Sequence, residues 1–197
     1  MRELLVPTGN KGKLAEIKLL LEGTPFIVLG LADVGITQEA EESGTTFEGN
    51  AIIKGMTYGI LSGKLTMSED SGLEIDALGG WPGVYTKPFA DTTSDQGHSA
   101  IFEKMKDISD VERGAQMHSV IALFDPSTMK VRLCEGIARG VITREARGAN
   151  GFGQDPLFKY DGSDKTGGEM NTEEKNSISH RAKSLAKAKE ILLTEFV

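Results

Sequence analysis

The alternation of short apolar runs with turn residues and helical patterns constrains the fold of this chain most. Residues 4–6 form a short apolar run, and after a Thr-Gly-Asn turn the apolar positions of residues 11–21 recur at helical spacing. A second apolar run follows at residues 26–29. The segments 115–124 and 131–142 flank an Asp-Pro-Ser turn, which is typical of an antiparallel hairpin. Early strand–helix alternation with a later hairpin predicts an α/β fold with a mixed sheet.

Sequence signals at helix ends place two further helices. Thr45 and Glu48 have the spacing of a capping box, so we expect a helix to open there and to continue to about Leu61. A C-terminal amphipathic helix is expected from about Ser179, with an apolar face that contains Leu185, Ala188, Leu192 and Phe196. No internal repeat or linker interrupts the chain, which predicts one domain over residues 1–197, with two lobes that share one core.

The charge balance and the apolar content narrow the class of partner. Lys and Arg number 22 against 29 Asp and Glu, a formal charge of −7, so a broad basic surface for a nucleic-acid polymer is not expected. No apolar stretch reaches membrane-spanning length, and the first residues do not form a signal peptide. Cys134 is the only cysteine, so no intrachain disulfide can form. These features predict a cytoplasmic protein that binds no membrane but can bind a small anion.

The turn Thr8-Gly9-Asn10 and the nearby Lys13 lie between an expected strand and an expected helix. Free backbone N–H groups and the helix dipole favour an anion at such a position. The segment is not a P-loop, because proline and leucine stand where that motif needs glycine and Ser or Thr. Two interpretations stay open, a phosphate-binding turn and a plain turn in which Asn10 caps the helix.

An apolar run at residues 65–68 leads directly into Glu69 and Asp70. Adjacent carboxylates at the end of a strand are a common way to hold Mg²⁺, which prefers oxygen ligands. One of the two could instead orient a water molecule for attack. The alternative is a solvated acidic turn without function.

Polar residues upstream of this acidic pair could join it. Glu42 lies in an acidic loop and could supply a further metal ligand, although such loops are usually solvated surface. Asn50 and Lys54 are four residues apart on the predicted helix, so they share a face and could point together into a cleft. Neither feature identifies a site by its own pattern.

The glycine-rich segment 148–156 predicts an irregular loop that exposes its backbone. Within it, Phe152 could stack on a planar base, and Asp155 could accept hydrogen bonds from base N–H groups. The alternative is a tight loop whose aromatic ring belongs to the core. The order of its glycines does not match the dinucleotide-binding fingerprint.

Cationic residues gather where the C-terminal helix is expected to begin. Lys175 precedes Ser179, the expected N-cap, and His180 and Arg181 fall in the first helical turn. Positive charge at a helix N-terminus opposes the helix dipole, so these side chains carry a cost in stability. Donation of hydrogen bonds to a ligand carbonyl would account for their presence.

Four sequence blocks, taken in order, resemble the inosine/xanthosine triphosphate pyrophosphatase family, also called non-canonical purine NTP pyrophosphatases. The blocks are TGNxxK at 8–13, DSGLxxDALGGxPGVY at 70–85, GFGxDPLF at 151–158 and EKNxISHRAxxL at 174–185. They span nearly the whole chain. The resemblance implies two α/β lobes around a long mixed sheet with the active site in the cleft between them, and a homodimer. It also implies Mg²⁺-dependent hydrolysis of ITP, dITP or XTP to the monophosphate and pyrophosphate.

The resemblance also implies a role for each matching residue. Asp70 matches the carboxylate that binds metal and activates water, with Glu42 and Glu69 as further metal-site residues. The remaining matches are to substrate. Ser71 follows Asp70 in the substrate pocket, the phosphate side comprises Thr8, Gly9, Asn10, Lys13 and Lys54, and the base side comprises Phe152, Gly153, Gln154, Asp155, Lys175, His180 and Arg181. Cationic donors suit a 6-oxo purine, whereas the 6-amino group of adenine would present donors to donors.

The chain departs from the family pattern in two places. Gln154 stands where the family usually has Tyr or Trp, and Lys87-Pro88 replaces a segment that usually contains an arginine. Both departures bear on base preference and leave the metal and phosphate residues in place. Two other functions remain in view, a Maf-type nucleotide pyrophosphatase and a non-catalytic protein that binds purine nucleotides.

Overall fold

The computed structural model describes residues 1–86 and 95–197, which contain a six-stranded mixed sheet. The strands are β1 (Arg2–Leu5), β2 (Phe26–Leu29), β3 (Leu65–Ile75), β4 (Gly114–Asp125), β5 (Lys130–Ile142) and β6 (Phe158–Tyr160). Their order across the sheet is β2-β1-β3-β4-β5-β6. β1 is parallel to β2 and to β3, whereas β5 is antiparallel to β6. The predicted α/β class with a mixed sheet is therefore confirmed.

Along the chain, helices alternate with the first strands, and further helices come after the last strand. Among the described residues, the α-helices are α1 (Lys11–Leu20), α2 (Phe47–Ser62), α4 (Asp95–Met105), α5 (Thr172–Ile178) and α6 (His180–Glu195). Short 3-10 turns cover Ala32–Val34, Asp76–Leu78, Gly83–Thr86, Asp110–Glu112 and Gly167–Glu169. Within the described ranges, no helix combines the length and the apolar character that a bilayer span requires.

The chain divides into two compact units, each with its own apolar core. Unit 1 comprises Met1–Asp70, Ser119–Gly136 and Lys183–Val197, and unit 2 comprises Ser71–His118 and Ile137–Ala182. The core of unit 1 draws on β1, β3, β4, α1 and α6. The core of unit 2 draws on the other halves of β3, β4 and β5, on α4 and on the segment around β6. The predicted lobes with an active-site cleft stay a prediction.

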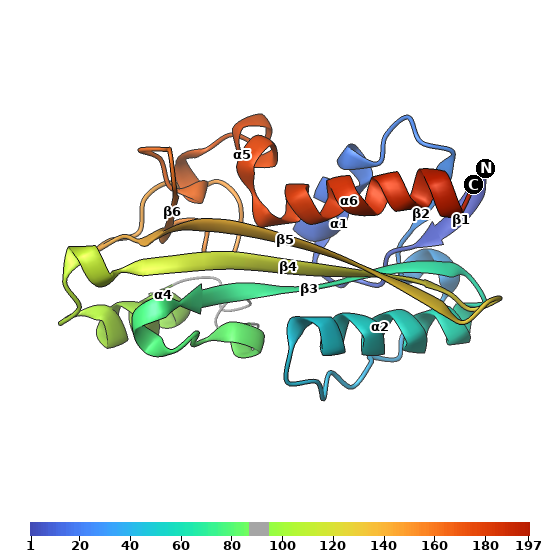
Figure 1. Cartoon of the computed structure of the whole chain (residues 1–197), viewed down its shortest axis with the longest axis horizontal. Coiled ribbons are helices and arrows are strands. Elements are labelled where there is room, and N and C mark those ends of the chain that lie inside the picture. Colours follow the sequence, from blue (N-terminus) through green and yellow to red (C-terminus); the bar gives the residue numbers. More distant parts are fainter. Residues whose placement is uncertain (87–94) are drawn as a thin grey trace. The chain divides into compact units, whose positions relative to one another are not determined.

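In unit 1 the sheet is covered on both faces, by α6 on one and by α2 on the other (Figure 1). Along β3, Met67 packs in the core with α1 and α6, whereas the hydroxyl of Ser68 donates to a backbone carbonyl of α2 at 2.6 Å. Successive side chains of a strand point to opposite faces, so both faces of β3 and β4 are buried. This explains why residues 120–124 are continuously apolar and almost fully buried.

Two glycines allow α2 to lie close to the sheet. A Cβ atom on Gly55 would lie 2.9 Å from the hydroxyl of Ser68, and one on Gly59 would lie 2.4 Å from the ring of Phe124. Both distances are too short for a real Cβ contact, so a larger residue would push the helix or the ring away. The glycines that weaken the helical pattern in the sequence therefore set the distance between α2 and β3.

Helix caps agree with the sequence in two of three cases. Asn10 caps α1 as predicted, and the hydroxyl of Ser179 accepts from the backbone N–H of Ala182 in the first turn of α6. The capping box predicted at Thr45 is wrong, since Thr46 is the N-cap of α2 and accepts from the backbone N–H of Gly49. Phe47 is buried as the first residue of α2, which sets the start of the helix one residue later.

Two segments are more regular than the sequence predicted. β3 does not end at residue 68 but continues to Ile75, because Leu73 and Ile75 alternate into the core of unit 2. The polar segment before α6, expected as a loop, contains α5, whose N-cap Asn171 forms a capping box with Glu174. The substitutions noted at Lys87 and Pro88 lie outside the described residues.

Gly59→Ala should lower the free energy of unfolding, although alanine is the better helix former. The propensity gain is about 1 kcal/mol, whereas overpacking against the buried Phe124 costs about 1–3 kcal/mol, so a net loss of about 1 kcal/mol or slightly more is expected. Urea denaturation followed by circular dichroism measures it. Ile60→Ala, on the exposed side of the same helix, is the control and should change stability little. A Gly59→Ala variant more stable than wild type would show that α2 does not approach the sheet this closely.

Candidate active site

The turn before α1 is a capped helix start with a lysine in its first helical turn. The carboxamide oxygen of Asn10 accepts from the backbone N–H of Lys13 at 3.0 Å, and the hydroxyl of Thr8 accepts from the N–H of Asn10 at 3.2 Å. Gly9 is exposed. The capping interpretation of Asn10 is thus confirmed, and phosphate binding at this turn stays a prediction.

Glu69 and Asp70 occupy adjacent positions inside β3, so their side chains leave opposite faces of the strand. Glu69 accepts from the hydroxyl of Ser119 at 2.9 Å and lies 3.8 Å from the ammonium group of Lys13. Asp70 instead contacts α2. This arrangement differs from the acidic turn at a strand end that the sequence indicated, because the strand continues past both carboxylates.

Asp70 is held by two side chains of α2, and Glu42 lies beside one of them. The ammonium group of Lys54 lies 3.1 Å from a carboxylate oxygen of Asp70 and 3.1 Å from one of Glu42. The amide nitrogen of Asn50 donates to the other oxygen of Asp70 at 3.2 Å. Asn50 is a site residue that the motifs did not assign, although its spacing of four residues from Lys54 was the signal for it.

Burial and the mutual attraction of Asp70, Lys54 and Glu42 explain the pKa shifts of Asp70 and Lys54. Burial raises the pKa of Asp70 above its ordinary value, and the attraction of Lys54 only partly opposes the shift. Burial alone would lower the pKa of Lys54, but the combined attraction of Asp70 and Glu42 raises it. Lys13 also acts electrostatically on Asp70. One ammonium group between two carboxylates is stabilised as a cation, while the buried carboxylate remains undercompensated.

An undercompensated carboxylate pair suits an additional cation. Glu42, Glu69 and Asp70 carry three negative charges against the two positive charges of Lys13 and Lys54, which leaves one negative charge in excess. Asp70 and Glu42 offer the hard oxygen ligands that Mg²⁺ prefers, and they share Lys54 as a neighbour. The contacts of Glu69 lie with Ser119 and Lys13 instead. Asp70 and Glu42 therefore fit a metal best, whereas Glu69 points to the opposite face of β3.

The predicted base-side residues all belong to unit 2, and Phe152, Asp155, Lys175 and Arg181 form a second cluster there. Lys175 lies 4.8 Å from the centre of the Phe152 ring, and the guanidinium of Arg181 lies 5.3 Å from it. One carboxylate oxygen of Asp155 accepts from Lys175 at 2.9 Å and from the backbone N–H of Phe152 at 2.8 Å. Asp155, Lys175, His180 and Arg181 are buried, and Phe152 is half-buried. The ring therefore lies beside two cations, and its role in stacking on a base stays a prediction.

Asp155 organises the loop that carries Phe152. A Cβ atom on Gly151 would lie 2.1 Å from an oxygen of Asp155, and one on Gly167 would lie 2.7 Å from the other oxygen. The loop is thus wrapped tightly around this carboxylate. The oxygen that bonds Lys175 is engaged inside the protein, so acceptance of a base N–H at that oxygen, as the sequence suggested, would need these bonds to rearrange.

Three residues complete the description of the site. Ser71 follows Asp70 in β3 and is half-buried. Gln154 is buried, and its amide nitrogen has no hydrogen-bond partner in the part of the chain that the structure describes. The carbonyl of Gly153 is contacted by His98 of α4 at 2.9 Å, a residue in a segment without any recognisable motif.

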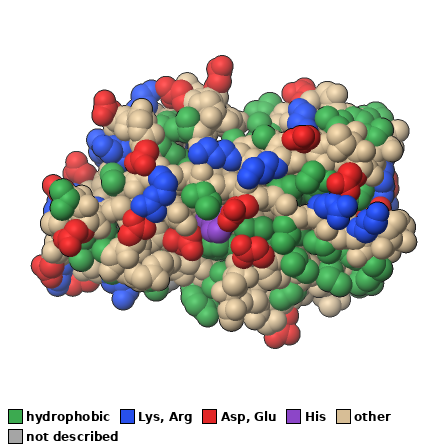
Figure 2. All heavy atoms as spheres, viewed as in Figure 1, with side chains coloured by type: hydrophobic (Ala, Val, Ile, Leu, Met, Phe, Trp, Pro, Cys, Tyr) green, Lys and Arg blue, Asp and Glu red, His purple; other side chains and the backbone are tan. Residues whose placement is uncertain are grey.

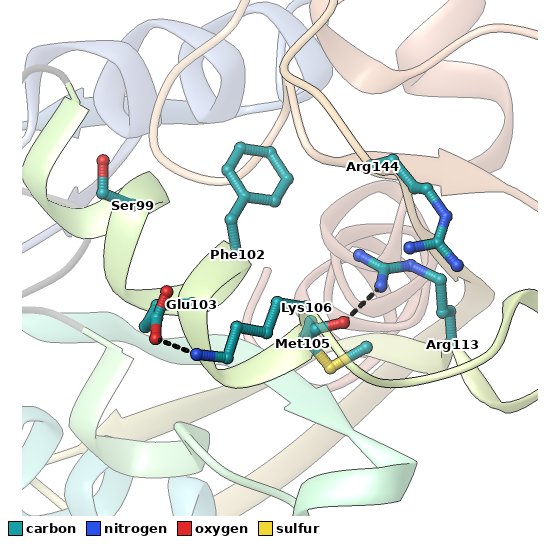
Figure 3. Close-up of a pocket in the computed structure, with 7 residues that line it drawn as sticks. All are labelled: Ser99, Phe102, Glu103, Met105, Lys106, Arg113 and Arg144. Atoms are coloured by element: carbon teal, nitrogen blue, oxygen red, sulfur yellow. Dashed lines mark hydrogen bonds and ion pairs between the residues drawn. The ribbon is translucent and has the colours of Figure 1, made fainter.

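A hollow of about 450 Å³ in unit 2 contains none of the predicted site residues. It is lined by Ser99, Phe102, Glu103, Met105, Lys106, Arg113 and Arg144 (Figure 3). Arg113 donates to the backbone carbonyl of Met105, and Lys106 pairs with Glu103. The face shown in Figure 2 carries Lys and Arg side chains interspersed with Asp and Glu. Neither feature competes with the two clusters as the candidate site.

Comparison with known proteins gives one consistent result. The family model described as the Ham1 family matches residues 4–191. The dITP/XTP pyrophosphatase of Pseudomonas aeruginosa is 43% identical over 197 residues, which cover 98% of each chain. The dITP/XTP pyrophosphatase of Escherichia coli K12 is 37% identical and is matched over 94% of this chain and 95% of its own.

Solved structures agree with this result. The HAM1 protein of Coxiella burnetii has a TM-score of 0.88 and 34% identity, covering 98% of this chain and 99% of its own. The Ham1 protein of Staphylococcus aureus has a TM-score of 0.87 and 32% identity, covering 98% of this chain and all of its own. Sequence and fold therefore point to the same group of proteins.

Lys175→Met should lower the free energy of unfolding by about 3–5 kcal/mol, because it leaves the buried Asp155 carboxylate without its cation. The control is Lys165→Met, which removes an ion pair with Glu174 whose side chains are 50% and 40% exposed. Its loss should be about 0–1 kcal/mol. Chemical denaturation of both variants gives the comparison. Equal small losses would mean that the Lys175–Asp155 pair is solvated in solution.

Proposed function

The chain belongs to the Ham1 family, and we propose that it hydrolyses non-canonical purine nucleoside triphosphates, ITP, dITP and XTP, to the monophosphate and pyrophosphate. Relatives that carry the name dITP/XTP pyrophosphatase align with 98% of this chain and with 98% of their own length. The Ham1 match over residues 4–191 favours this reaction over that of a Maf-type pyrophosphatase.

The observation that carries the proposal is the buried carboxylate of Asp70 between Lys54 and Asn50, with Glu42 beside Lys54. A protein that only sequestered nucleotides would need cations for the phosphates but no buried carboxylate with a raised pKa. Such a carboxylate is the better proton acceptor, since its basicity is closer to that needed for general-base catalysis near neutral pH. The site therefore supports hydrolysis over binding alone.

In the proposed mechanism, Asp70 accepts the proton of a water molecule whose oxygen attacks the α-phosphorus. The bond between the α-phosphorus and the bridging oxygen breaks, and pyrophosphate leaves with that oxygen. Lys54 and Asn50 hold the carboxylate in place, and Lys13 and Lys54 offset the charge of the phosphates. Mg²⁺, held by Asp70 and Glu42, would add Lewis-acid stabilisation of the phosphate oxygens. Glu69 would support Lys13 from the other face of β3.

We assign base recognition to the cluster of unit 2. Phe152 would stack on the purine, and Arg181 and His180 would donate to the 6-oxo oxygen. Adenine offers a 6-amino group there, so buried donors would stay unpaired at a cost of about 1–3 kcal/mol each. Thr8 and Gly9 are assigned to the phosphate side, and Ser71 to the substrate pocket, on the strength of the family pattern. A homodimer, also expected from the family, would be tested by light scattering.

Asp70→Asn should abolish pyrophosphate release from ITP while the fold stays intact. The amide is nearly isosteric but cannot act as a base and is a poorer ligand for Mg²⁺, so kcat should fall by about two orders of magnitude or more. The measurement is pyrophosphate release with and without Mg²⁺ for ITP, XTP, dITP, GTP and ATP. Asp161→Asn, at an exposed position of unit 2, is the matched control. Near-normal turnover by Asp70→Asn would remove this residue from the reaction.

Arg181→Ala should lower kcat/KM for ITP more than for ATP. ATP presents no 6-oxo oxygen to this donor, so the ITP-specific loss should be about tenfold or more, as for a charge-assisted hydrogen bond. Lys13→Ala, on the phosphate side, is the comparison and should reduce kcat/KM for both nucleotides by similar factors. If Arg181→Ala reduced all substrates equally, the guanidinium would have a structural or phosphate-binding role instead.

A further inference from the structure

His98 connects α4 to the loop that carries Phe152. Its Nε2 atom lies 2.9 Å from the carbonyl oxygen of Gly153, the residue directly after Phe152. A carbonyl oxygen only accepts hydrogen bonds, so Nε2 must carry the hydrogen and donate it. His98 lies in none of the sequence motifs and has no part in the proposed mechanism.

The helix that carries His98, α4, is anchored in the core of unit 2. Ile101 and Met105, three and seven residues after His98, lie on the same side of the helix and are fully buried in the core of unit 2. At the last turn, Arg113 donates to the carbonyl of Met105 at 2.7 Å (Figure 3). Arg113 also donates to the carbonyl of Ile142 at 2.8 Å, which ties the end of α4 to the end of β5.

The backbone on both sides of Phe152 adopts conformations that depend on glycine. Gly151 and Gly153, on either side of Phe152, have φ angles of 73° and 59°, a region that only glycine adopts readily. The backbone N–H of Phe152 is held by Asp155, which restrains the peptide on one side of the ring. The carbonyl that His98 holds belongs to the residue on the other side.

We propose that His98 is a positioning residue for base recognition. By donating to the carbonyl of Gly153, it restrains the Gly153–Gln154 peptide, one residue beyond Phe152, and thereby helps to set the plane of the ring against which the purine stacks. The Asp155 bond and the His98 bond hold the two ends of this short segment, and the cations Lys175 and Arg181 hold the ring itself. This inference rests on the proposed function, because it assigns the purine to Phe152.

The test measures ITP affinity apart from turnover. Calorimetry without metal gives the Kd of ITP, and steady-state assays with Mg²⁺ give KM and kcat, for wild type, His98→Ala, His98→Gln and Ser99→Ala. We expect His98→Ala to raise Kd and KM about three- to tenfold, the effect of one ordinary hydrogen bond, with little change in kcat. His98→Gln places an amide N–H near the position of Nε2 and should restore most of the loss. Ser99→Ala, exposed on the same helix, should behave as wild type.

A second background separates positioning from a general structural role. If His98 acts through Phe152, then adding His98→Ala to Phe152→Ala should cost no further affinity, whereas a merely structural residue would add its full loss. His98→Asn, which keeps an amide but shortens its reach, replaces the alanine variant if that one does not fold.

Several outcomes would overturn the inference. An unchanged Kd and KM in folded His98→Ala, a full additional loss in the Phe152→Ala background, or a failure of His98→Gln to recover affinity would each do so. Wild type that binds ITP but releases no pyrophosphate would refute the proposed reaction only, since the Kd series still decides the role of His98. Wild type that neither binds ITP without metal nor releases pyrophosphate from it with Mg²⁺ would refute both.

Discussion

The burial of Asp70 between β3 and α2 is the interaction on which the rest of the site depends. A carboxylate taken out of water needs compensation, and α2 supplies it with the ammonium group of Lys54 and the amide of Asn50. The helix can reach the carboxylate only because Gly55 and Gly59 let it lie close to the sheet. The compensation is incomplete, so burial keeps the pKa of Asp70 above its ordinary value.

Because side chains alternate between the two faces of β3, its two neighbouring carboxylates make different contacts. Asp70 contacts Asn50 and Lys54 of α2, whereas Glu69 contacts Ser119 and Lys13. Through its neighbour Glu69, the buried carboxylate of Asp70 is thus linked to Lys13 by one regular strand and not by an irregular loop. Because both faces of the sheet in unit 1 are covered by helices, these polar groups are partly shielded from water and their electrostatic interactions are stronger than at a free surface.

In unit 2 a buried carboxylate is likewise compensated by a lysine, and this pair orders a loop. The buried pair of Lys175 and Asp155 neutralises two charges and at the same time orders the glycine-rich loop around Phe152. Breaking such a pair leaves an uncompensated charge, so the pair specifies one conformation of a segment that glycines would otherwise leave free. His98 adds a contact from α4 to the same loop. The cluster is therefore built from a buried ion pair and one histidine donor, and the Phe152 ring is carried on that framework.

The sequence by itself determined the elements whose signals are local, and the tertiary structure decided those that depend on packing. Asn10 and Ser179 act as caps because a short polar side chain bonds to a backbone N–H within three residues, which sequence order alone ensures. The motifs likewise predicted chemical roles for Lys13, Asp70, Phe152 and Arg181, and these roles stay predictions. The extent of β3, the start of α2 at Phe47 and the roles of Asn50 and His98 were not readable, since each depends on which side chain another element buries beside it. Residue 98 and residue 153 are far apart in the chain, and only a fold that packs α4 into the core of unit 2 brings them within hydrogen-bond distance.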